Sequence, residues 1–339
     1  MNLDLLHAVV EGRSLTEEQA EAAMRALLAG ESTPVLTAAF LTALRMNGET
    51  VDELTGFARA MRAAATPVPI RPEFRPLLDT CGTGGTGTSS FNISTVAAFV
   101  VAGAGVRVAK HGNRSISSKC GSADVLEALG VKTRIEPAMA ARAIEEVGIG
   151  FLFAPTFHQS TRHVQPVRLE LKIRSAFNYL GPLTNPAGAE MQVAGTWSDD
   201  AAQKIAGALV RLGLQRGYTV HGSDGLGELT ITGPSTVFSI RDGAIEKQTL
   251  HPEDFGFAPR PFDAIRGGDA ERNKAIAESI LRGEPGAPRE IVLMNAALAL
   301  FTAGKGSDLK ESAKIAAESI DSGAAQRKLT QLKDLVSQE

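Results

Sequence analysis

Leu77-Leu-Asp-Thr80, followed by Cys81-Gly-Thr-Gly-Gly-Thr-Gly87, is typical of a short buried strand that runs into a glycine-rich loop. From Thr80 to Ala123 the chain has no aspartate or glutamate, whereas it carries four basic residues. Glycines let backbone N–H groups approach an oxyanion closely, and a helix that begins beyond them adds a favourable dipole. In a chain of formal net charge −3, this segment predicts a local anion site whose ligand is a small molecule with several phosphates.

A second short turn, Lys110-His-Gly-Asn-Arg114, follows the next expected strand, Val106-Arg-Val-Ala109. In open α/β sheets, ligands bind beyond the carboxyl ends of the parallel strands. The turn therefore adds positive charge to the same anion site. The alternative is a solvated loop whose charge is fortuitous.

The spacing Gly82-x-Gly84-x-x-Gly87 also matches the dinucleotide fingerprint. That site needs a carboxylate about 20 residues further on to bind a ribose hydroxyl, and here that position lies in sequence without acids. NAD is therefore disfavoured, and NADP slightly less so, because Lys110 and Arg114 are available for a 2′-phosphate. The loop lacks the Gly-Lys-Ser/Thr ending of a Walker P-loop.

Expected strands and helices alternate from the glycine loop to about residue 220. This alternation predicts a mainly parallel sheet covered by helices on both faces. Residues 1–66 show helical patterns only, with N-terminal capping signals at Thr16, Thr33 and Thr50. We therefore predict an α/β protein that consists of a small all-helical lobe and a larger α/β domain with a mainly parallel central sheet.

Two interruptions suggest the domain boundaries. Prolines concentrate between Pro67 and Pro76, and one long helical pattern, Gln165–Tyr179, is inserted in the alternation. The expected helical lobe is 1–70, joined by inserted helices at about 164–190, and the expected α/β domain is 71–163 and 191–339. Residues from about 270 to 337 again show mostly helical patterns.

Composition narrows the class of protein. The chain has 339 residues, of which 43% are hydrophobic and 22% charged, which is ordinary for a globular protein. The slightly negative net charge argues against nucleic acid as a partner, and no apolar run reaches the length of about 20 residues that a membrane span needs. Two cysteines without a Cys-x-x-Cys pair, and an N-terminus unlike a signal peptide, predict a cytoplasmic protein.

Two acids lie among glycines in His221-Gly-Ser-Asp-Gly-Leu-Gly-Glu228, just after a later expected strand. Polyphosphates usually bind together with Mg²⁺, which takes few protein carboxylates and keeps several waters. Asp224 and Glu228 are therefore candidate metal ligands. They fit equally well as acids of a surface turn, and the pattern leaves both interpretations open.

Arg168 lies in the inserted helical pattern, where Lys172 is expected on the same helix face. An arginine on a helix beside a cleft suits bidentate binding of a carboxylate. The alternative is a solvated arginine on an amphipathic helix. His158, upstream of it, is by itself more typical of a surface or core residue than of a catalyst.

Several long motifs resemble the anthranilate phosphoribosyltransferase family over most of the chain. They are Gly82-Thr-Gly-Gly85, Phe91-Asn-Ile-Ser-Thr95, Ala109-Lys-His-Gly-Asn-Arg114, Ser117-Ser118, Gly121-Ser-Ala-Asp-Val-Leu-Glu-Ala-Leu-Gly130, Phe151-Leu-Phe-Ala154 and Phe177-Asn-Tyr-Leu-Gly-Pro-Leu-Thr-Asn-Pro186. The resemblance implies an active site between the helical lobe and the α/β domain, and a homodimer formed through the helical lobe. It also implies the second step of tryptophan biosynthesis. In that step the amine of anthranilate displaces pyrophosphate from 5-phosphoribosyl pyrophosphate (PRPP), with Mg²⁺ as cofactor.

The same resemblance implies roles for individual residues. Those expected to bind PRPP are Gly82, Gly85, Thr86, Ser90, Asn92, Ser94, Thr95, Lys110, His111, Gly112, Asn113, Ser118 and Ser122. Those expected to bind anthranilate are Gly82, Asn113, His158, Arg168 and Gly181, with Arg168 paired to the carboxylate. Those expected to bind the metal are Ser94 and Glu228, with Asp224 as a hypothetical substitute for a missing ligand. No residue is assigned as a general base, because an aromatic amine is already neutral at pH 7.

The chain departs from the family pattern in four places. Thr86 stands where the family usually has aspartate, and Gly227 replaces the first acid of an Asp-Glu pair. Gln159–Thr161 differs from the usual Pro-Ala-Met, and Lys172 replaces a usual glycine. The two lost carboxylates predict weaker or rearranged magnesium binding.

Two alternative functions follow from these differences. One is a related phosphoribosyltransferase or nucleoside phosphorylase that uses a different aromatic acceptor. The other is a non-catalytic relative that binds nucleic acid, which would need a broad basic face and the loss of the PRPP motifs.

Overall fold

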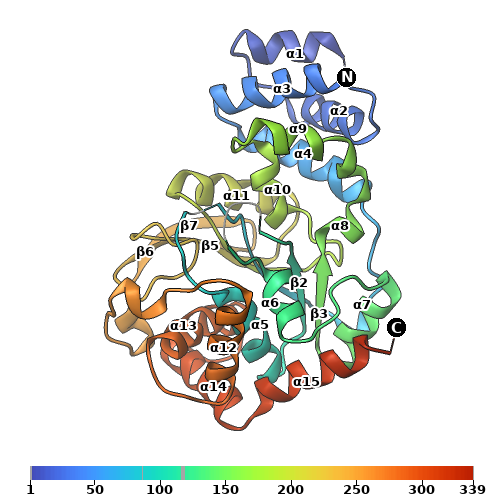
Figure 1. Ribbon diagram of the computed structural model, residues 1–339. Coiled ribbons are helices and arrows are strands. Elements are labelled where there is room, and N and C mark those ends of the chain that lie inside the picture. Colours follow the sequence, from blue (N-terminus) through green and yellow to red (C-terminus); the bar gives the residue numbers. More distant parts are fainter. Residues whose placement is uncertain (1, 86, 116–118, 339) are drawn as a thin grey trace.

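A helical bundle and an α/β domain make up the chain, whose computed structural model describes residues 2–85, 87–115 and 119–338 (Figure 1). The bundle, at the top of Figure 1, confirms the predicted all-helical start of the chain. Its helices are α1 (Leu3–Val10), α2 (Glu17–Leu28), α3 (Pro34–Asn47) and α4 (Val51–Ala63). Thr16, Thr33 and Thr50 cap α2, α3 and α4, as their sequence signals predict.

Two phenylalanines form the centre of the bundle core. Phe40 on α3 and Phe57 on α4 are completely buried, and their rings meet edge to face at 6.4 Å. Removing one such ring costs about 3–5 kcal/mol. The short bundle is therefore held mainly by packing between its helices and not by helix propensity.

The sheet of the α/β domain has seven strands in the order β3-β2-β1-β4-β5-β6-β7. They are β1 (Leu78–Gly82), β2 (Val108–Gly112), β3 (Ile149–Phe153), β4 (Met191–Gly195), β5 (Arg216–Gly222), β6 (Ser235–Arg241) and β7 (Ala244–Leu250). The first five are parallel to one another, which confirms the predicted mainly parallel sheet. The antiparallel hairpin β6–β7 follows the alternating strands and helices, and the sequence pattern did not predict it.

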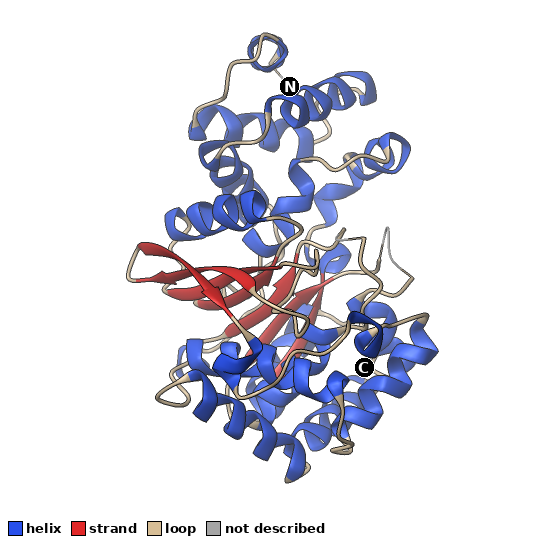
Figure 2. Cartoon of the chain, turned by 90° about the vertical axis from the view of Figure 1, so that its left-hand side faces the viewer, coloured by secondary structure: helices blue, strands red, loops and turns tan. Residues whose placement is uncertain are grey.

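Helices cover both faces of the sheet (Figure 2). The face away from the bundle is covered by α5 (Ile93–Gly103), α13 (Ala287–Thr302) and α15 (Ala324–Val336), and α14 (Leu309–Asp321) packs on these helices. The remaining helices of this domain are α6 (Ser122–Ala128), α7 (Pro137–Arg142) and α12 (Ala270–Leu281). In the described part of the chain, no helix has both the length and the apolar character needed to cross a membrane.

The segment inserted between β3 and β4 connects the bundle to the sheet. It contains α8 (Ala154–Phe157), α9 (Gln165–Leu171) and α10 (Ala176–Leu183), and α11 (Asp199–Arg211) follows β4. α9 packs on α3, whereas α10 and α11 pack on α4. The site is built where this segment meets the strand ends.

The predicted single helix over Gln165–Tyr179 is wrong. Helix α9 ends at Leu171, and Lys172 adopts a left-handed conformation with φ 52° before α10 begins. The apolar pattern continues across the break because both helices bury residues in the same core. Arg168 and Lys172 therefore do not share a helix face.

Candidate active site

Two predicted loops meet at one edge of the sheet. β1 and β2 are parallel neighbours, with Leu78 paired to Val108, so Gly82 and Gly112 end their strands side by side. The glycine-rich loop follows Gly82, and the basic turn leaves β2 at Gly112. A side-chain carbon at Gly112 would lie 2.9 Å from the Ser122 hydroxyl. The start of α6 therefore lies against the same strand end.

A third loop is brought to this edge by a close backbone contact. A side-chain carbon on Gly195, at the end of β4, would lie 1.7 Å from the Gly227 carbonyl oxygen. Only glycine permits this approach. The loop after β5 therefore rests directly on the end of β4, which is paired with β1 at Gly82, and Glu228 comes close to the glycine loop.

Lys110 is a buried cation at the centre of these loops. Its side chain is 3% exposed and donates to the Thr80 carbonyl and, at 3.4 Å, to the Ser94 hydroxyl. Burial lowers its pKa, while the negative charges of Asp79 and Glu228 act in the opposite direction. Positive charge is thus held beside the glycine loop, as the sequence predicts.

Asp79 connects the strands beneath this site and was not singled out by sequence. It is fully buried in β1, where Oδ1 accepts from the His111 N–H (3.1 Å) and Oδ2 from Asn185 Nδ2 (2.8 Å). Asn185 also donates to the Ala109 carbonyl (2.8 Å). Burial raises the pKa of Asp79 to about 6. The network ties the segment after α10 to both strands.

Glu228 and Asp224 have different environments. Ser94 lies beside Glu228, and burial raises the pKa of that carboxyl to about 7. Asp224 accepts from the hydroxyls of Thr230 (2.6 Å) and Thr232 (2.9 Å) and from the Leu226 N–H (3.1 Å). Its carboxylate is thus occupied in holding its own loop. This geometry favours Glu228 over Asp224 as a metal ligand.

Metal binding by the protein alone is not expected here. In the described ranges, no three His, Cys, Asp or Glu side chains gather into a group able to hold a metal ion. Glu228 and Ser94 do fit a Mg²⁺ ion that takes most of its ligands from phosphates and water. A partly buried carboxyl with a raised pKa has an incomplete positive environment, which such an ion completes.

Two imidazoles face each other where α10 approaches the sheet. The rings of His111 and His158 are 5.2 Å apart, and His111 Nδ1 is 3.0 Å from the Gly181 carbonyl. Burial lowers the pKa of His111 to about 3 and that of His158 to about 4, so both rings are neutral. His111 was expected among the PRPP ligands, yet its ring lies with two residues expected to bind anthranilate.

Three nitrogens of this pair lack partners. Among the described residues, none accepts from or donates to His111 Nε2 or either ring nitrogen of His158. The Thr184 backbone approaches His158 without reaching hydrogen-bond geometry. Leaving a buried polar atom unpaired costs about 1–3 kcal/mol. These nitrogens are therefore suited to a ligand that supplies the missing hydrogen bonds.

Arg168 lies on α9, and most of its donors have no partner among the described residues. Its guanidinium donates to Gln165 Oε1 (3.3 Å) and lies 5.0 Å from the centre of the Phe177 ring. Burial lowers its pKa. An ordered, partly desolvated guanidinium of this kind suits a carboxylate.

Arg114 does not contribute the expected charge to the anion site. It forms ion pairs with Asp124 (2.8 Å) and Glu127 (2.6 Å), the first acids after the acid-free stretch. Asn113 beside it is exposed, as are Gly82 and Gly85. Two residues expected to bind PRPP, Thr86 and Ser118, lie outside the described ranges.

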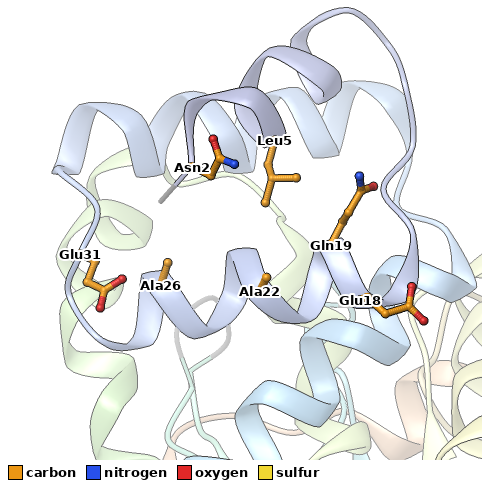
Figure 3. A pocket seen from close by; sticks show the side chains of 7 residues that line it. All are labelled: Asn2, Leu5, Glu18, Gln19, Ala22, Ala26 and Glu31. Carbon is orange, nitrogen blue, oxygen red and sulfur yellow. The ribbon is translucent and has the colours of Figure 1, made fainter.

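A separate cavity of about 560 Å³ lies in the helical bundle between α1 and α2 (Figure 3). It is lined by Asn2, Leu5, Glu18, Gln19, Ala22, Ala26 and Glu31. This lining includes no lysine or arginine, and both of its charged side chains are acidic. The cavity therefore does not suit phosphates and is not part of the site.

Two family models match the chain over most of its length. Residues 3–65 match the helical bundle domain of a glycosyl transferase family, and residues 75–326 match the α/β domain of that family. The anthranilate phosphoribosyltransferase of Solibacter usitatus is 56% identical over 332 residues, which cover 98% of each chain. That of Moorella thermoacetica is 54% identical, covering 95% of this chain and 94% of its own.

Solved structures agree with this result. The crystal structure of anthranilate phosphoribosyltransferase from Thermus thermophilus superposes with a TM-score of 0.92 at 45% identity, covering 98% of this chain and 99% of its own. The Saccharomyces cerevisiae enzyme in complex with PRPP and Mg has a TM-score of 0.92 at 27% identity, covering 99% and 98%. The chain therefore belongs to the anthranilate phosphoribosyltransferase family of glycosyltransferases.

Proposed function

We propose that this protein transfers the phosphoribosyl group of PRPP to the amine of anthranilate, giving N-(5-phosphoribosyl)anthranilate and pyrophosphate in tryptophan biosynthesis. The observation that carries the proposal is the junction at the strand ends. There, Lys110, Ser94 and Glu228 adjoin the glycine loop, while His111, His158 and Gly181 lie together on the side of the inserted helices. The names of the relatives, and the PRPP and Mg of the yeast complex, support it.

The glycine loop and Lys110 would hold the leaving pyrophosphate. Backbone N–H groups and hydroxyls bind phosphate oxygens well at a helix start, and α5 begins directly after Asn92. The C1–O bond breaks as the amine forms its bond to C1, so negative charge builds up on pyrophosphate. The ammonium of Lys110 stabilises that charge without reorganisation, because its hydrogen bonds already fix it. The residues assigned to PRPP are those given above, Thr86 and Ser118 included, whereas the ring of His111 is assigned to the acceptor.

Glu228 and the Ser94 hydroxyl would hold Mg²⁺ together with the substrate's phosphates. When bound, the ion neutralises negative charge on pyrophosphate. With Thr86 and Gly227 in place of two carboxylates, the chain supplies fewer charged ligands, so we expect a requirement for higher Mg²⁺ concentrations. Asp224 stays a loop-holding residue.

The side formed by the inserted helices would bind anthranilate. Arg168 pairs with the carboxylate, and the unpaired nitrogens of His158 and His111 complete their hydrogen bonds with the amine and carboxylate. Gly181 leaves room for the flat ring, and Asn113 borders it from the other loop. The amine is neutral at pH 7, so the proton that it loses after attack needs only a weak acceptor.

The test follows the loss of anthranilate fluorescence on addition of PRPP, with Mg²⁺ titrated from micromolar to millimolar. We expect turnover that saturates only at high Mg²⁺. Glu228→Gln should move the midpoint further up, whereas Asp224→Ala should leave it in place. Absence of turnover at every Mg²⁺ concentration, with PRPP binding intact, would point to another acceptor and overturn the proposal.

A homodimer through the helical lobe is part of this proposal. α1 and α3 pack together, and each exposes apolar residues one or more turns apart on one face. The exposed fractions are 49% for Leu3, 63% for Val10, 77% for Val35 and 82% for Met46. Large apolar side chains exposed on two neighbouring helices are typical of a protein interface. Sedimentation should give a dimer that Val35→Glu with Met46→Glu dissociates, while Ile245→Glu on β7 leaves it intact.

We also propose the cytoplasm as the site of action. Cys81 is a free and buried thiol, which agrees with a reducing compartment.

For the domains we propose 1–70, joined by about 164–190, as the helical lobe, and 71–163 with 191–339 as the α/β domain. Buried residues of the bundle share one core with α10 and α11. The joining helices therefore pack with the lobe, and limited proteolysis between Thr66 and Arg75 tests this boundary.

A further inference from the structure

The second half of the glycine loop is fastened by a segment from far along the chain, Arg266–Asn273. The Gly267 N–H donates to the Ser89 carbonyl at 2.7 Å, and Ser90 forms an isolated β-bridge with Arg266. A side-chain carbon on Gly267 would lie 2.6 Å from the Phe91 backbone nitrogen. The segment therefore packs backbone to backbone against the loop.

Asn273 completes this connection from the first turns of α12. Its side chain is 2% exposed. Oδ1 accepts from the Gly268 N–H at 2.8 Å, and Nδ2 donates to Asn92 Oδ1 at 2.9 Å. One end of the amide thus holds its own segment, and the other end holds Asn92.

Asn92 is held from its other end as well. Its Nδ2 donates to the Cys120 carbonyl at 3.2 Å. Because an amide has a donor at one end and an acceptor at the other, contacts to Asn273 and Cys120 together select one orientation. Asn92 immediately precedes α5, whose first turn carries Ser94 and Thr95.

We propose that Asn273 is a positioning residue for PRPP, acting through its hydrogen bond to Asn92. This bond orients the Asn92 amide and fixes the start of α5 before the substrate binds. The inference rests on the proposed PRPP-binding role of Asn92 and its neighbours. A site ordered in advance binds more tightly, because less freedom is lost on binding.

Asn273→Asp replaces the donor that faces Asn92 by an oxygen and adds a negative charge, so the neutral Asn273→Ala described below is read beside it. The two side chains have the same shape, and aspartate keeps an acceptor for Gly268 but faces Asn92 with oxygen. We expect the KM for PRPP to rise about tenfold while the KM for anthranilate stays unchanged. Lys274→Ala, at the next and partly exposed position of α12, is the matched control and should leave both constants unchanged. An unaltered KM for PRPP in Asn273→Asp would overturn the proposal.

A double-mutant cycle separates positioning from general stability. Asn273→Ala removes both hydrogen bonds without adding a charge, and it replaces the aspartate variant if that one does not fold. Once Asn92→Ala is present, we expect Asn273→Ala to have little further effect on the KM for PRPP. Additive effects would contradict action through Asn92.

Calorimetric titration with PRPP distinguishes this inference from the proposed function. If the wild type binds PRPP without turnover, the proposed transfer fails, and the PRPP affinities of the same variants decide the role of Asn273. If the wild type does not bind PRPP, both proposals are overturned.

Discussion

The two sides of the site differ in how many of their polar groups already have partners. On the phosphate side, Lys110, Asp79 and Asn92 are hydrogen-bonded to groups from other strands and helices. On the acceptor side, three imidazole nitrogens of His111 and His158 are buried, and none has a partner among the described residues. The hydrogen bonds of these phosphate-side residues are made within the protein, whereas those of the two imidazoles are left for a ligand to complete.

The difference reflects what each side has to bind. A pyrophosphate is highly charged and strongly hydrated, so groups that replace its water must be in place beforehand. An aromatic ring with one amine and one carboxylate offers few polar atoms. Unpaired buried nitrogens then favour the acceptor that satisfies them over one that does not.

Removal of Asp79 should have the largest effect on stability, because it breaks the hydrogen-bond network of the phosphate side. Asp79→Ala leaves the His111 N–H and one Asn185 donor without their buried acceptor. We expect the free energy of unfolding in urea to fall by about 3–5 kcal/mol. Asp79→Asn, which keeps one acceptor, should lose clearly less. A loss below about 1 kcal/mol in the alanine variant would contradict the idea that this side is held by its own network.

The acceptor side should make stability depend on pH. His158 has a pKa of about 4 in the folded protein and an ordinary value near 6.5 when unfolded. Below about pH 6.5 the unfolded chain binds more protons than the folded one. The contribution of neutral His158 to the free energy of unfolding is therefore complete above about pH 6.5 and is lost as the pH falls toward 4. From pH 7 to pH 4.5, the free energy of unfolding of His158→Gln should rise relative to that of the wild type by on the order of 2–3 kcal/mol, as measured by unfolding curves at both pH values.

The control for this prediction is His7→Gln on the exposed surface of α1, which should follow the wild type at both pH values. If the difference in unfolding free energy between His158→Gln and the wild type is the same at both pH values, the buried imidazole does not cause the pH dependence. The neighbouring His111 is buried as well, so some pH dependence should survive in the variant.

A substitution at Arg168 tests whether the acceptor side binds anthranilate. Arg168→Lys keeps a charge but loses the planar fork that binds a carboxylate with two hydrogen bonds. We expect the KM for anthranilate to rise by about 10–30-fold, equivalent to about 1.4–2 kcal/mol, without a change in the KM for PRPP. The exposed Arg162, on the same inserted segment, provides the control. Equal changes in both KM values would mean that Arg168 serves the fold and not the acceptor.

The smallest effect is expected at Lys172, in the link between the two helices of the acceptor side. Its φ of 52° is costly for a residue with a side chain. Lys172→Gly should raise the free energy of unfolding by about 0.5–1 kcal/mol, as measured by thermal unfolding. Asp242→Gly, at φ 51° in the β6–β7 turn, should gain less, because aspartate tolerates this conformation. A loss of stability at Lys172→Gly would show that its side chain makes a compensating contact.

Local sequence patterns predicted much of the fold. The capping threonines, the short parallel strands and the glycine loop depend on residues close together in the chain, and all are found in the structure. The β6–β7 hairpin was missed, and the break at Lys172 was overlooked. A continuous apolar pattern does not reveal a change of helix direction.

The sequence by itself determined the class of fold, the anion-binding loop and the family motifs, because these are encoded by residue type at short spacing. Tertiary structure alone decided which polar groups are free to act. Arg114 is neutralised by Asp124 and Glu127, and Asp224 is occupied by two threonines. Asp79 and Asn92 are held by Asn185 and Asn273, partners more than a hundred positions away along the chain. The physical reason is that a charge or an amide acts according to its burial and its hydrogen-bond partners, and both arise only when distant segments pack together.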